Sequence, residues 1–407
     1  MNQLVGPVVL VLFGFIFFSS SLDSISPLLT YSDEFLVLFV FCVTLFGGKI
    51  DRQHFRICLV LIIFWLYVML NSIFSSYYIG IALTGTDLFL FSKPILLYVG
   101  MMNLPINVIK WISKRIQPVA HLYLLIAFAF YFINLAIPVF PDGDRRFGIE
   151  AYAFTADNEG EFGNLALIAG LLAYALTKRE RKRFNAIALM SLLMLISLRF
   201  KAIVLTAIFL LMISLSRSGF FQRKSIQVSG VKKARFTRIR ISYILAILPI
   251  GLILGYGQFS KYFLEEMTPR LFLLISSVKV ANDFFPFGAG AGTFGSAVSR
   301  LHYSELYYDL GFSGIWGLSN TDDRFLSDSF WPMIFAQYGF IGAVFVISLY
   351  VMVLRNILPR WSSNNLRSVG VAIILLNLTL STLGSAVLIG SLGTLLIVTL
   401  VLLIRET

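Results

Sequence analysis

Residues 331–354 read WPMIFAQYGFIGAVFVISLYVMVL, an apolar run that contains no charged side chain. A helix needs about 20 consecutive apolar residues to cross the hydrocarbon core of a bilayer, and this run is long enough. Similar runs recur along the whole chain. The sequence therefore predicts an all-α polytopic membrane protein, not a soluble protein with a single anchor.

Twelve apolar runs are predicted to be transmembrane helices in one integral-membrane domain, 1–407. They are residues 5–22, 34–47, 56–75, 79–102, 118–137, 161–177, 184–198, 201–216, 241–258, 331–354, 368–384 and 386–403. The first run follows no basic segment and precedes no small-residue cleavage site. It is read as the first span and not as a signal peptide.

The composition excludes several classes of protein. Of the 407 residues, 58% are hydrophobic and 13% are charged. In soluble domains about 45–50% of the residues are apolar and about 25% are charged. Intrinsic disorder, a disulfide scaffold and a nucleic-acid-binding module are excluded on these numbers. The net charge of +12 would suggest an anionic partner in a soluble protein, but in a membrane protein it records orientation.

The basic residues divide unevenly between the two sets of loops. One set, with the C-terminus, holds 23 Lys and Arg residues against three acids, and the other holds nine against 17. Because cytoplasmic loops collect Lys and Arg, the first set is predicted to be cytoplasmic, with both termini on that side. The net-acidic outer side must then bind any anion with a few positioned arginines.

Two outer loops are long, residues 138–160 and 259–330. Long connections are usually functional, so the site is expected there. In the larger loop, 259–283 is predicted to form two helices broken at Pro269. Many aromatic residues follow, among them Tyr303, with Trp331 at the start of the next span. They are read either as an interfacial lid or as a glycan-binding cleft, in which Tyr303 and Trp331 stack on sugar rings.

Arg270 is the first candidate site residue. Thr268 and Pro269 precede it, and these residue types favour the N-cap and the first position of a helix. A cation in a first turn opposes the helix dipole unless an anion is bound there, for which a diphosphate is the natural candidate. The alternative is an ion pair with Glu265 or Glu266.

Asp328 is the second candidate. It lies just before the span that begins at residue 331. It is read as a general base that activates an acceptor hydroxyl, or else as a carboxylate that caps that span.

Other outer basic residues are candidate diphosphate ligands. Arg199 and Lys201 occupy the short turn between two predicted spans, where snorkelling to the interface is the alternative. Arg145 and Arg146 stand among Asp142, Asp144 and Glu150, where local ion pairs are the alternative. Asn158 is read as a hydrogen-bonding partner of sugar hydroxyls.

Several motifs are given a structural interpretation. Gly290, Gly292 and Gly295 match G-x-G-x-x-G, but no βαβ unit surrounds them, so they are read as a tight turn where the backbone approaches another segment or a ligand. Asp87 and Lys93 lie within the run 79–102, where charges are functional hypotheses by default. Lys93 is alternatively read as snorkelling to the cytoplasmic surface. The Cys and His residues show no ligand spacing, and neither a metal nor a cofactor is expected.

The arrangement resembles the superfamily of O-antigen ligases and Wzy-type O-antigen polymerases. The ligase pattern H-[NSQ]-x9-G-x2-[GTY] is matched from Ser329 to Gly342, except that Asp328 stands where the ligases have His. The polymerase pattern Arg-x10-Gly occurs at Arg300–Gly311. Three shorter segments are also similar to the family: Arg270 followed by Pro286-Phe-Gly288-Ala-Gly290, Ser197-Leu-Arg199, and Arg146-Phe-Gly148 followed by Asp157-Asn158.

The resemblance implies an inverting, metal-independent glycosyltransferase that uses undecaprenyl-diphosphate-linked glycans at the periplasmic face of the bacterial inner membrane. Arg270 and Arg199 would stabilise the departing diphosphate, and Asp328 would take the proton of the acceptor hydroxyl. The pair Asp322-Asp323 is not read as a Mg²⁺ site, because arginines would already neutralise the diphosphate.

The polymerase reading is preferred to the ligase reading. The ligase His is missing, and a polymerase must hold two lipid-linked glycans, so that Arg145, Arg146, Arg300 and Arg324 would serve the second diphosphate. The expected partners are lipid-linked donor and acceptor glycans, membrane lipid and a chain-length regulator protein, with no nucleic acid. The alternatives are a ligase that transfers glycan to lipid A-core and a lipid-linked glycan flippase. The flippase is disfavoured by the scarcity of charges within the spans.

Overall fold

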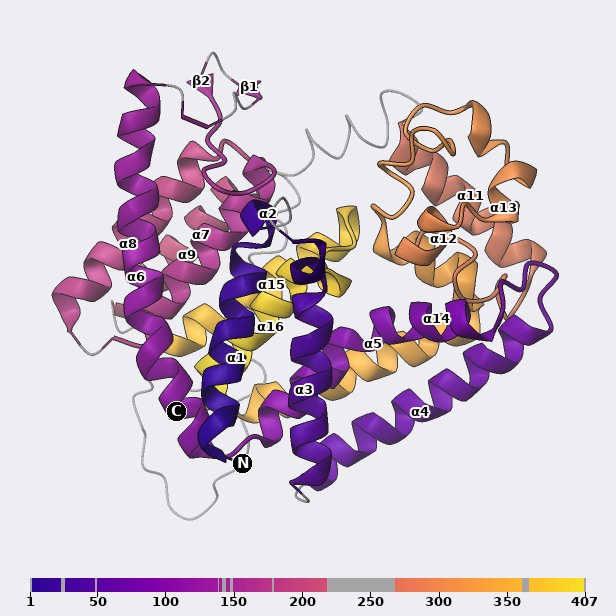
Figure 1. Ribbon diagram of the computed structural model, residues 1–407, viewed down its shortest axis with the longest axis horizontal. Helices are drawn as coiled ribbons and strands as arrows, with labels where there is room; N and C mark the ends of the chain where they lie inside the picture. The colour runs from indigo at the N-terminus through magenta and orange to yellow at the C-terminus, as the bar shows by residue number, and fades with distance from the viewer. Residues whose placement is uncertain are drawn as a thin grey trace, which may run out of the picture. The chain divides into compact units, whose positions relative to one another are not determined.

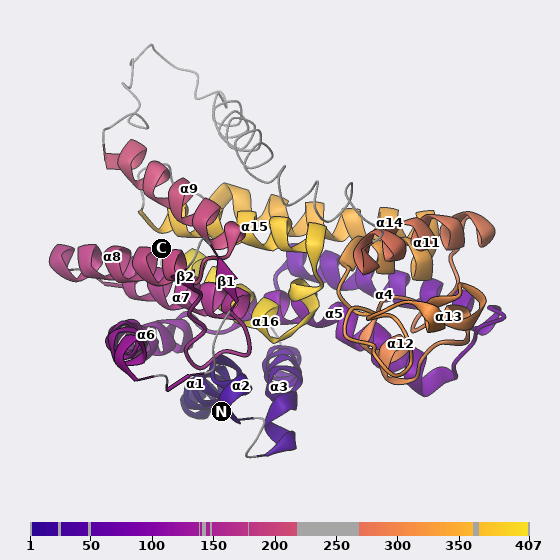
Figure 2. The same ribbon diagram turned by 90° about the horizontal axis from the view of Figure 1, so that it is seen from above.

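The computed structural model describes residues 2–22, 26–47, 50–137, 139–140, 144–146, 149–177, 179–217, 268–360 and 366–405. Its elements in these ranges are helices, apart from one short β-ribbon (Figures 1 and 2). Six described helices are long and apolar enough to cross a membrane: Leu28–Phe46, Arg52–Ile73, Ile81–Asn103, Ile106–Ala136, Phe330–Arg360 and Arg367–Gly384. The predictions of a helical fold and of membrane-spanning helices are confirmed at this level, while the number of twelve spans stays a prediction.

The helix bounds differ from the predicted runs in two informative places. The run 5–22 divides into α1 (Asn2–Phe17) and α2 (Ser19–Leu22). Helix α6 (Ile106–Ala136) includes residues 106–117, for which the sequence predicts a loop. This basic segment is amphipathic: Val108, Ile109, Ile112 and Ile116 are buried at helical spacing, which a search for uninterrupted apolar runs does not detect. The predicted run 241–258 lies outside the described residues.

The chain divides into two units, each described by itself. The first comprises Met1–Ala120, Met267–Trp361 and Ile374–Thr407, and the second comprises His121–Glu266 and Ser362–Ile373. Besides α1 and α2, the elements of the first unit are η1 (Pro27–Tyr31), α3 (Ser32–Phe46), α4 (Arg52–Ile73), α5 (Ile81–Asn103), α11 (Pro269–Asp283), α12 (Ala297–Leu301), α13 (Glu305–Asp309), η2 (Phe312–Gly314), α14 (Phe330–Ile357), η3 (Leu358–Arg360), η4 (Val387–Ile389) and α16 (Ser391–Arg405). The second unit contains β1 (Arg145–Arg146), β2 (Ile149–Glu150), α7 (Glu159–Ala175), α8 (Glu180–Ile196) and α9 (Phe200–Arg217). Helices α6 and α15 (Leu366–Gly384) contribute residues to both units.

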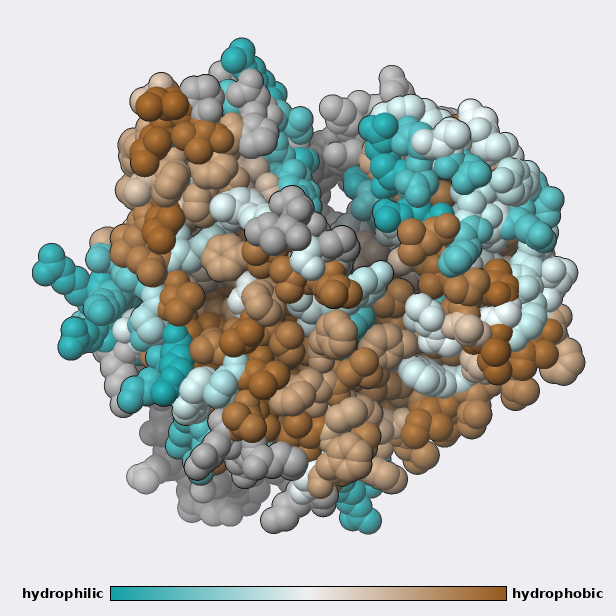
Figure 3. All heavy atoms as spheres, viewed as in Figure 1, coloured by the Kyte–Doolittle hydropathy of each residue, from teal (hydrophilic) through white to brown (hydrophobic). Residues whose placement is uncertain are grey.

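In the first unit, α4 packs against both α5 and α14, and α11 packs against α14. The outer side of α4 exposes large apolar side chains, including Leu59, Ile62, Leu66 and Leu70. Figure 3 shows hydrophobic side chains along α4 and hydrophilic ones over the segment that carries α12 and α13. An exposed apolar helix face of this length is suited to lipid rather than to water.

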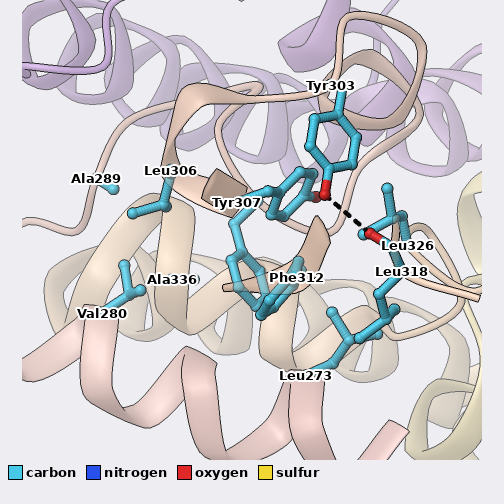
Figure 4. Packing of buried hydrophobic residues seen from close by; sticks show 11 residues of the cluster. Leu273, Val280, Ala289, Tyr303, Leu306, Tyr307, Phe312, Leu318, Leu326 and Ala336 are labelled. Atoms are coloured by element: carbon cyan, nitrogen blue, oxygen red, sulfur yellow. Dashed lines mark hydrogen bonds between the residues drawn. The ribbon is translucent and has the colours of Figure 1, made fainter. Parts of the chain in front are cut away.

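Residues 268–330 fold around an aromatic core of their own (Figure 4). Leu273 and Val280 of α11 contribute to this core. Tyr307 and Phe312 stack at its centre, with ring centroids 5.0 Å apart. The described part of the predicted large loop is therefore a compact helical segment of the first unit. Helix α11 begins at the predicted break, Pro269.

A glycine-rich loop, residues 286–296, joins α11 to α12, and its residues 288–296 are buried. Gly288, Gly290, Gly292 and Gly295 all have positive φ angles. A Cβ atom on Gly288 would lie 2.4 Å from the backbone nitrogen of Gly339, and one on Gly290 would lie 3.2 Å from Cα of Ser72. The prediction that these glycines allow close backbone approach is confirmed.

Helix α14 is interrupted where this loop meets it. Gly339 has φ 64° and ψ −165°, which breaks the regular hydrogen bonding of the helix. The carbonyls of Ala336 and Gln337 accept instead from the N–H groups of Ala289 (2.8 Å) and Gly290 (2.9 Å), and Ile341 N donates to Pro286 O (3.3 Å). The loop thus satisfies the backbone groups that the kink releases.

Replacement of Gly339 tests the close contact between the loop and the kink of α14. In Gly339→Ala, a Cβ atom would meet Pro286 O at 2.4 Å in a backbone conformation that L-residues disfavour. We expect a loss of about 3 kcal/mol or more in the free energy of unfolding. Gly314→Ala is the control, because no atom lies within 4 Å of its Cβ position, and it should change stability by about 0.5 kcal/mol or less. Equal thermal unfolding temperatures of the two purified variants would mean that the close contact between the loop and the kink of α14 does not stabilise the protein.

Candidate functional site

The structure brings together the two residues predicted to be catalytic. Arg270 Nε lies 2.9 Å from Asp328 Oδ2, and Nη2 donates to the same oxygen. Both side chains are about three-quarters buried. The partners of this pair are 58 residues apart in the sequence, and the packing of α11 against α14 holds them together.

Arg270 lies in the first turn of α11 as predicted. Thr268 is the N-cap, and its hydroxyl accepts from Leu271 N at 3.3 Å, while Pro269 occupies the first helical position. Asp328 neutralises the guanidinium in this structure. The alternative partners Glu265 and Glu266 lie outside the described residues. A cation beside the positive end of a helix dipole is stabilised by an anion, and here that anion is the Asp328 carboxylate.

Asp328 lies at the start of a second helix, α14, but does not cap it. The N-cap is Ser329, which makes no side-chain capping bond, and the Asp328 carboxylate binds Arg270 instead. Ser329 Oγ is buried and has no hydrogen-bond partner among the described residues. The starts of α11 and α14, the Arg270 guanidinium and one carboxylate therefore share one small region.

Burial raises the pKa of the Asp328 carboxyl above its usual range, because its loss of hydration outweighs the attraction of Arg270. Asp328 is consequently a stronger proton acceptor than an exposed aspartate once it is ionised. In general, a guanidinium can stabilise a departing diphosphate and a carboxylate can accept a proton from an attacking hydroxyl.

The predicted cations Arg300 and Arg324 belong to the same unit and are already paired. Arg300 Nε lies 3.7 Å from Asp323, and Arg324 Nε donates to Asp322 at 2.7 Å. The Arg324 guanidinium also lies over the ring of Trp316, 5.3 Å from its centroid. No group of three or more Asp, Glu, His or Cys residues is placed to hold a metal ion in the ranges that the structure covers.

The second unit contains the other predicted cations. Arg199 binds Glu159 with Nε at 3.1 Å and Nη2 at 2.5 Å, and its Nη2 lies 3.7 Å from Asp144. Lys201 is half-buried in the first turn of α9. Arg145 faces Glu150 across the antiparallel pair of β1 and β2, and Arg146 is its neighbour in β1. Their roles as diphosphate ligands stay predictions.

The three predicted glycan ligands have structural contacts. Asn158 is the N-cap of α7 and accepts from Glu161 N at 3.0 Å. Tyr303 is buried in the aromatic core and donates to Leu318 O at 3.1 Å (Figure 4). The Trp331 ring contacts the rings of Phe330 and Phe335. Glycan binding by these residues stays a prediction.

Polar residues within the apolar helices fix the glycine-rich loop, and sequence reasoning missed most of them. Asp87 Oδ2 accepts from Gly292 N at 3.1 Å and from the Tyr338 hydroxyl at 3.3 Å. Ser72 Oγ accepts from Ala291 N at 2.9 Å, and Gln337 donates to Phe294 O at 2.6 Å. The sequence feature that could have identified Ser72 and Gln337 is their position as isolated polar residues in the apolar runs 56–75 and 331–354.

Lys93 also has partners that the sequence did not identify. Its ammonium lies 2.6 Å from Asp33 and 2.6 Å from Glu34, at the start of α3. Only 4% of the Lys93 side chain is exposed. The interpretation that Lys93 snorkels to the surface is replaced by a buried ion cluster that ties α5 to α3.

We found no protein-family model that matches the chain and no curated protein similar to it in sequence. The assignment of function therefore depends on the residues themselves.

The Arg199–Glu159 pair can be tested by a double-mutant cycle. Arg199→Gln leaves the buried Glu159 carboxylate without its guanidinium, and we expect a loss of about 1–3 kcal/mol in stability. Adding Glu159→Gln should recover part of this loss, because an amide carries no charge to compensate. Thermal unfolding of the purified variants measures the coupling. Strictly additive effects would mean that the two side chains do not depend on each other.

Proposed function

We propose that the protein is a membrane glycosyltransferase that polymerises undecaprenyl-diphosphate-linked oligosaccharide units into a surface polysaccharide. The Arg270–Asp328 pair is the observation that carries this proposal. The sequence predicts a role in glycosyl transfer for each of these residues, and they are in direct contact.

In the proposed reaction, the donor diphosphate binds at the N-terminus of α11 and at Arg270. The acceptor hydroxyl attacks the anomeric carbon of the donor and transfers its proton to Asp328. The new glycosidic bond forms as the bond to the diphosphate oxygen breaks, and the electron pair leaves with the diphosphate. Attack from the face opposite the leaving group inverts the anomeric configuration. Arg270 stabilises the charge that develops on the departing oxygen.

The ion pair between Arg270 and Asp328 links donor binding to the proton affinity of Asp328. When a diphosphate takes over the Arg270 guanidinium, Asp328 loses part of the attraction that lowers its pKa. Its proton affinity therefore rises when the donor is in place. The further cations Arg145, Arg146, Arg199, Lys201, Arg300 and Arg324 remain predicted ligands of the donor or acceptor diphosphate.

We further propose twelve spans in the bacterial inner membrane, with both termini in the cytoplasm and the Arg270–Asp328 pair on the periplasmic side. The distribution of Lys and Arg among the loops supports this orientation. The exposed apolar face of α4 supports contact with lipid.

Alanine variants test the catalytic roles. Arg270→Ala and Asp328→Ala should each abolish long-chain polymer at an unchanged protein level, because each removes a group that acts in the transition state. Lys279→Ala on α11 and Glu305→Ala on α13 are controls that each remove one exposed charge outside the pair, and both should retain polymer. Purified protein supplied with its lipid-linked repeat unit should lengthen the lipid-linked glycan. A product formed only with a lipid A-core acceptor would indicate a ligase. Single units stranded on the inner face in Asp328→Ala would indicate a transporter.

Single cysteines test the orientation. In a chain with Cys42 and Cys58 replaced by Ala, a membrane-impermeant maleimide should label Asn320→Cys in spheroplasts. It should label Asn107→Cys only after permeabilisation. Both positions are exposed, so access to the reagent depends on the side of the membrane. The reverse pattern would reject the proposed topology.

A further inference from the structure

A cationic cavity lies in the first unit, where the ends of four helical segments meet. It has a volume of about 690 Å³ and is lined by Ile50, Asp51, His54, Met102, Asn103, Arg360, Ile404 and Arg405. These residues come from the beginning of α4 and from the ends of α5, α16 and η3. All four ends belong to the set of loops predicted to be cytoplasmic, so the cavity is separate from the Arg270–Asp328 pair.

The two arginines in this cavity have few partners. Arg405 donates to the carbonyl of Met102, and Arg360 lies 3.7 Å from the sulfur of the same residue. Each guanidinium has five N–H donors, so these contacts leave most of them unused. Within the described ranges, neither arginine forms an ion pair with an acid, and Asp51 is the one acidic residue in the lining. The cavity therefore carries a net positive charge.

His54 belongs to the wall of the cavity and is held in place by Asn103. It is 1% exposed, and its Nδ1 lies 3.2 Å from Asn103 Oδ1, which also accepts from Asp51 N. Because Asn103 Oδ1 can only accept, Nδ1 carries the hydrogen. Nε2 is buried, and the Asn356 side chain lies on the inner side of the ring as a further hydrogen-bonding group. The imidazole therefore forms a neutral part of the wall between the two arginines and the interior.

We propose that this cavity binds a phosphate group. The guanidinium groups of Arg360 and Arg405 bind the phosphate oxygens, and the Asp51 carboxylate accepts from a hydroxyl or amine on the same ligand. The volume falls in the range of sites for small molecules. At the predicted cytoplasmic surface, the phosphate belongs either to a phospholipid headgroup or to a soluble phosphate ester.

Native mass spectrometry of the purified full-length protein tests this site. The protein is titrated with phosphatidylglycerol, with diacylglycerol of the same acyl chains, and with glycerol 3-phosphate. We expect one tightly retained phosphatidylglycerol and much weaker retention of diacylglycerol. Arg360→Gln/Arg405→Gln should weaken phosphatidylglycerol binding about tenfold or more, as expected for the loss of charge-assisted hydrogen bonds. Arg56→Gln/Arg355→Gln removes two exposed charges from the same predicted side outside the cavity and should bind as the unmodified protein does.

The arms of the experiment separate the two sources of phosphate. Retained phosphatidylglycerol that glycerol 3-phosphate does not displace identifies a lipid site. Binding of glycerol 3-phosphate itself, lost in the double variant, identifies a soluble ligand. Equal retention of phosphatidylglycerol and diacylglycerol, or equal effects of the cavity and control variants, would overturn the proposal. If Arg405→Gln prevents folding, phosphatidylglycerol binding by the single variant Arg360→Gln tests the proposal. This variant should fold, because Arg360 has no hydrogen bond to oxygen in the described residues.

Discussion

The buried backbone of the glycine-rich loop is the constraint on which the first unit depends. Residues 288–296 are buried, and peptide groups removed from water must be hydrogen-bonded inside the protein. The kinked backbone of α14 supplies some of the partners, and Ser72, Asp87 and Gln337 supply others. Polar residues that would weaken an isolated apolar helix are thus required here. The loop in turn keeps α4, α5 and α14 together.

Electrostatics in this protein is local. The net charge of +12 arises mainly from loops predicted to be cytoplasmic, whereas Lys93, Arg199 and Arg270 each lie beside one or two carboxylates. Arg270 has Asp328, Arg199 has Glu159, and Lys93 has two acids. Such pairs hold segments together at rest, and any anionic ligand of Arg270 or Arg199 must compete with a carboxylate already in place.

The sequence predicted the helical class, the start of α11 and the role of the glycines, because each depends on local chemistry: apolar run length, cap residues and positive φ. It could not predict that Arg270 meets Asp328 or that Lys93 meets Asp33, because those contacts depend on how distant helices pack. The segment 106–117 was misassigned for another reason: its buried residues recur at helical spacing among Lys and Arg, so no uninterrupted apolar run exists.

The placement of the Arg270–Asp328 pair at two helix starts has an evolutionary consequence. Arg270 lies in the first turn of α11 and Asp328 lies two residues before α14, so the packing of α11 against α14 brings the two charges together. Between these helices, Phe325 O accepts from Asp328 N, and residues 303–326 supply most of the aromatic core. Exchanges of the exposed side chains in this segment leave those contacts in place. The exposed surface of this segment can therefore change in evolution while the paired charges stay in contact.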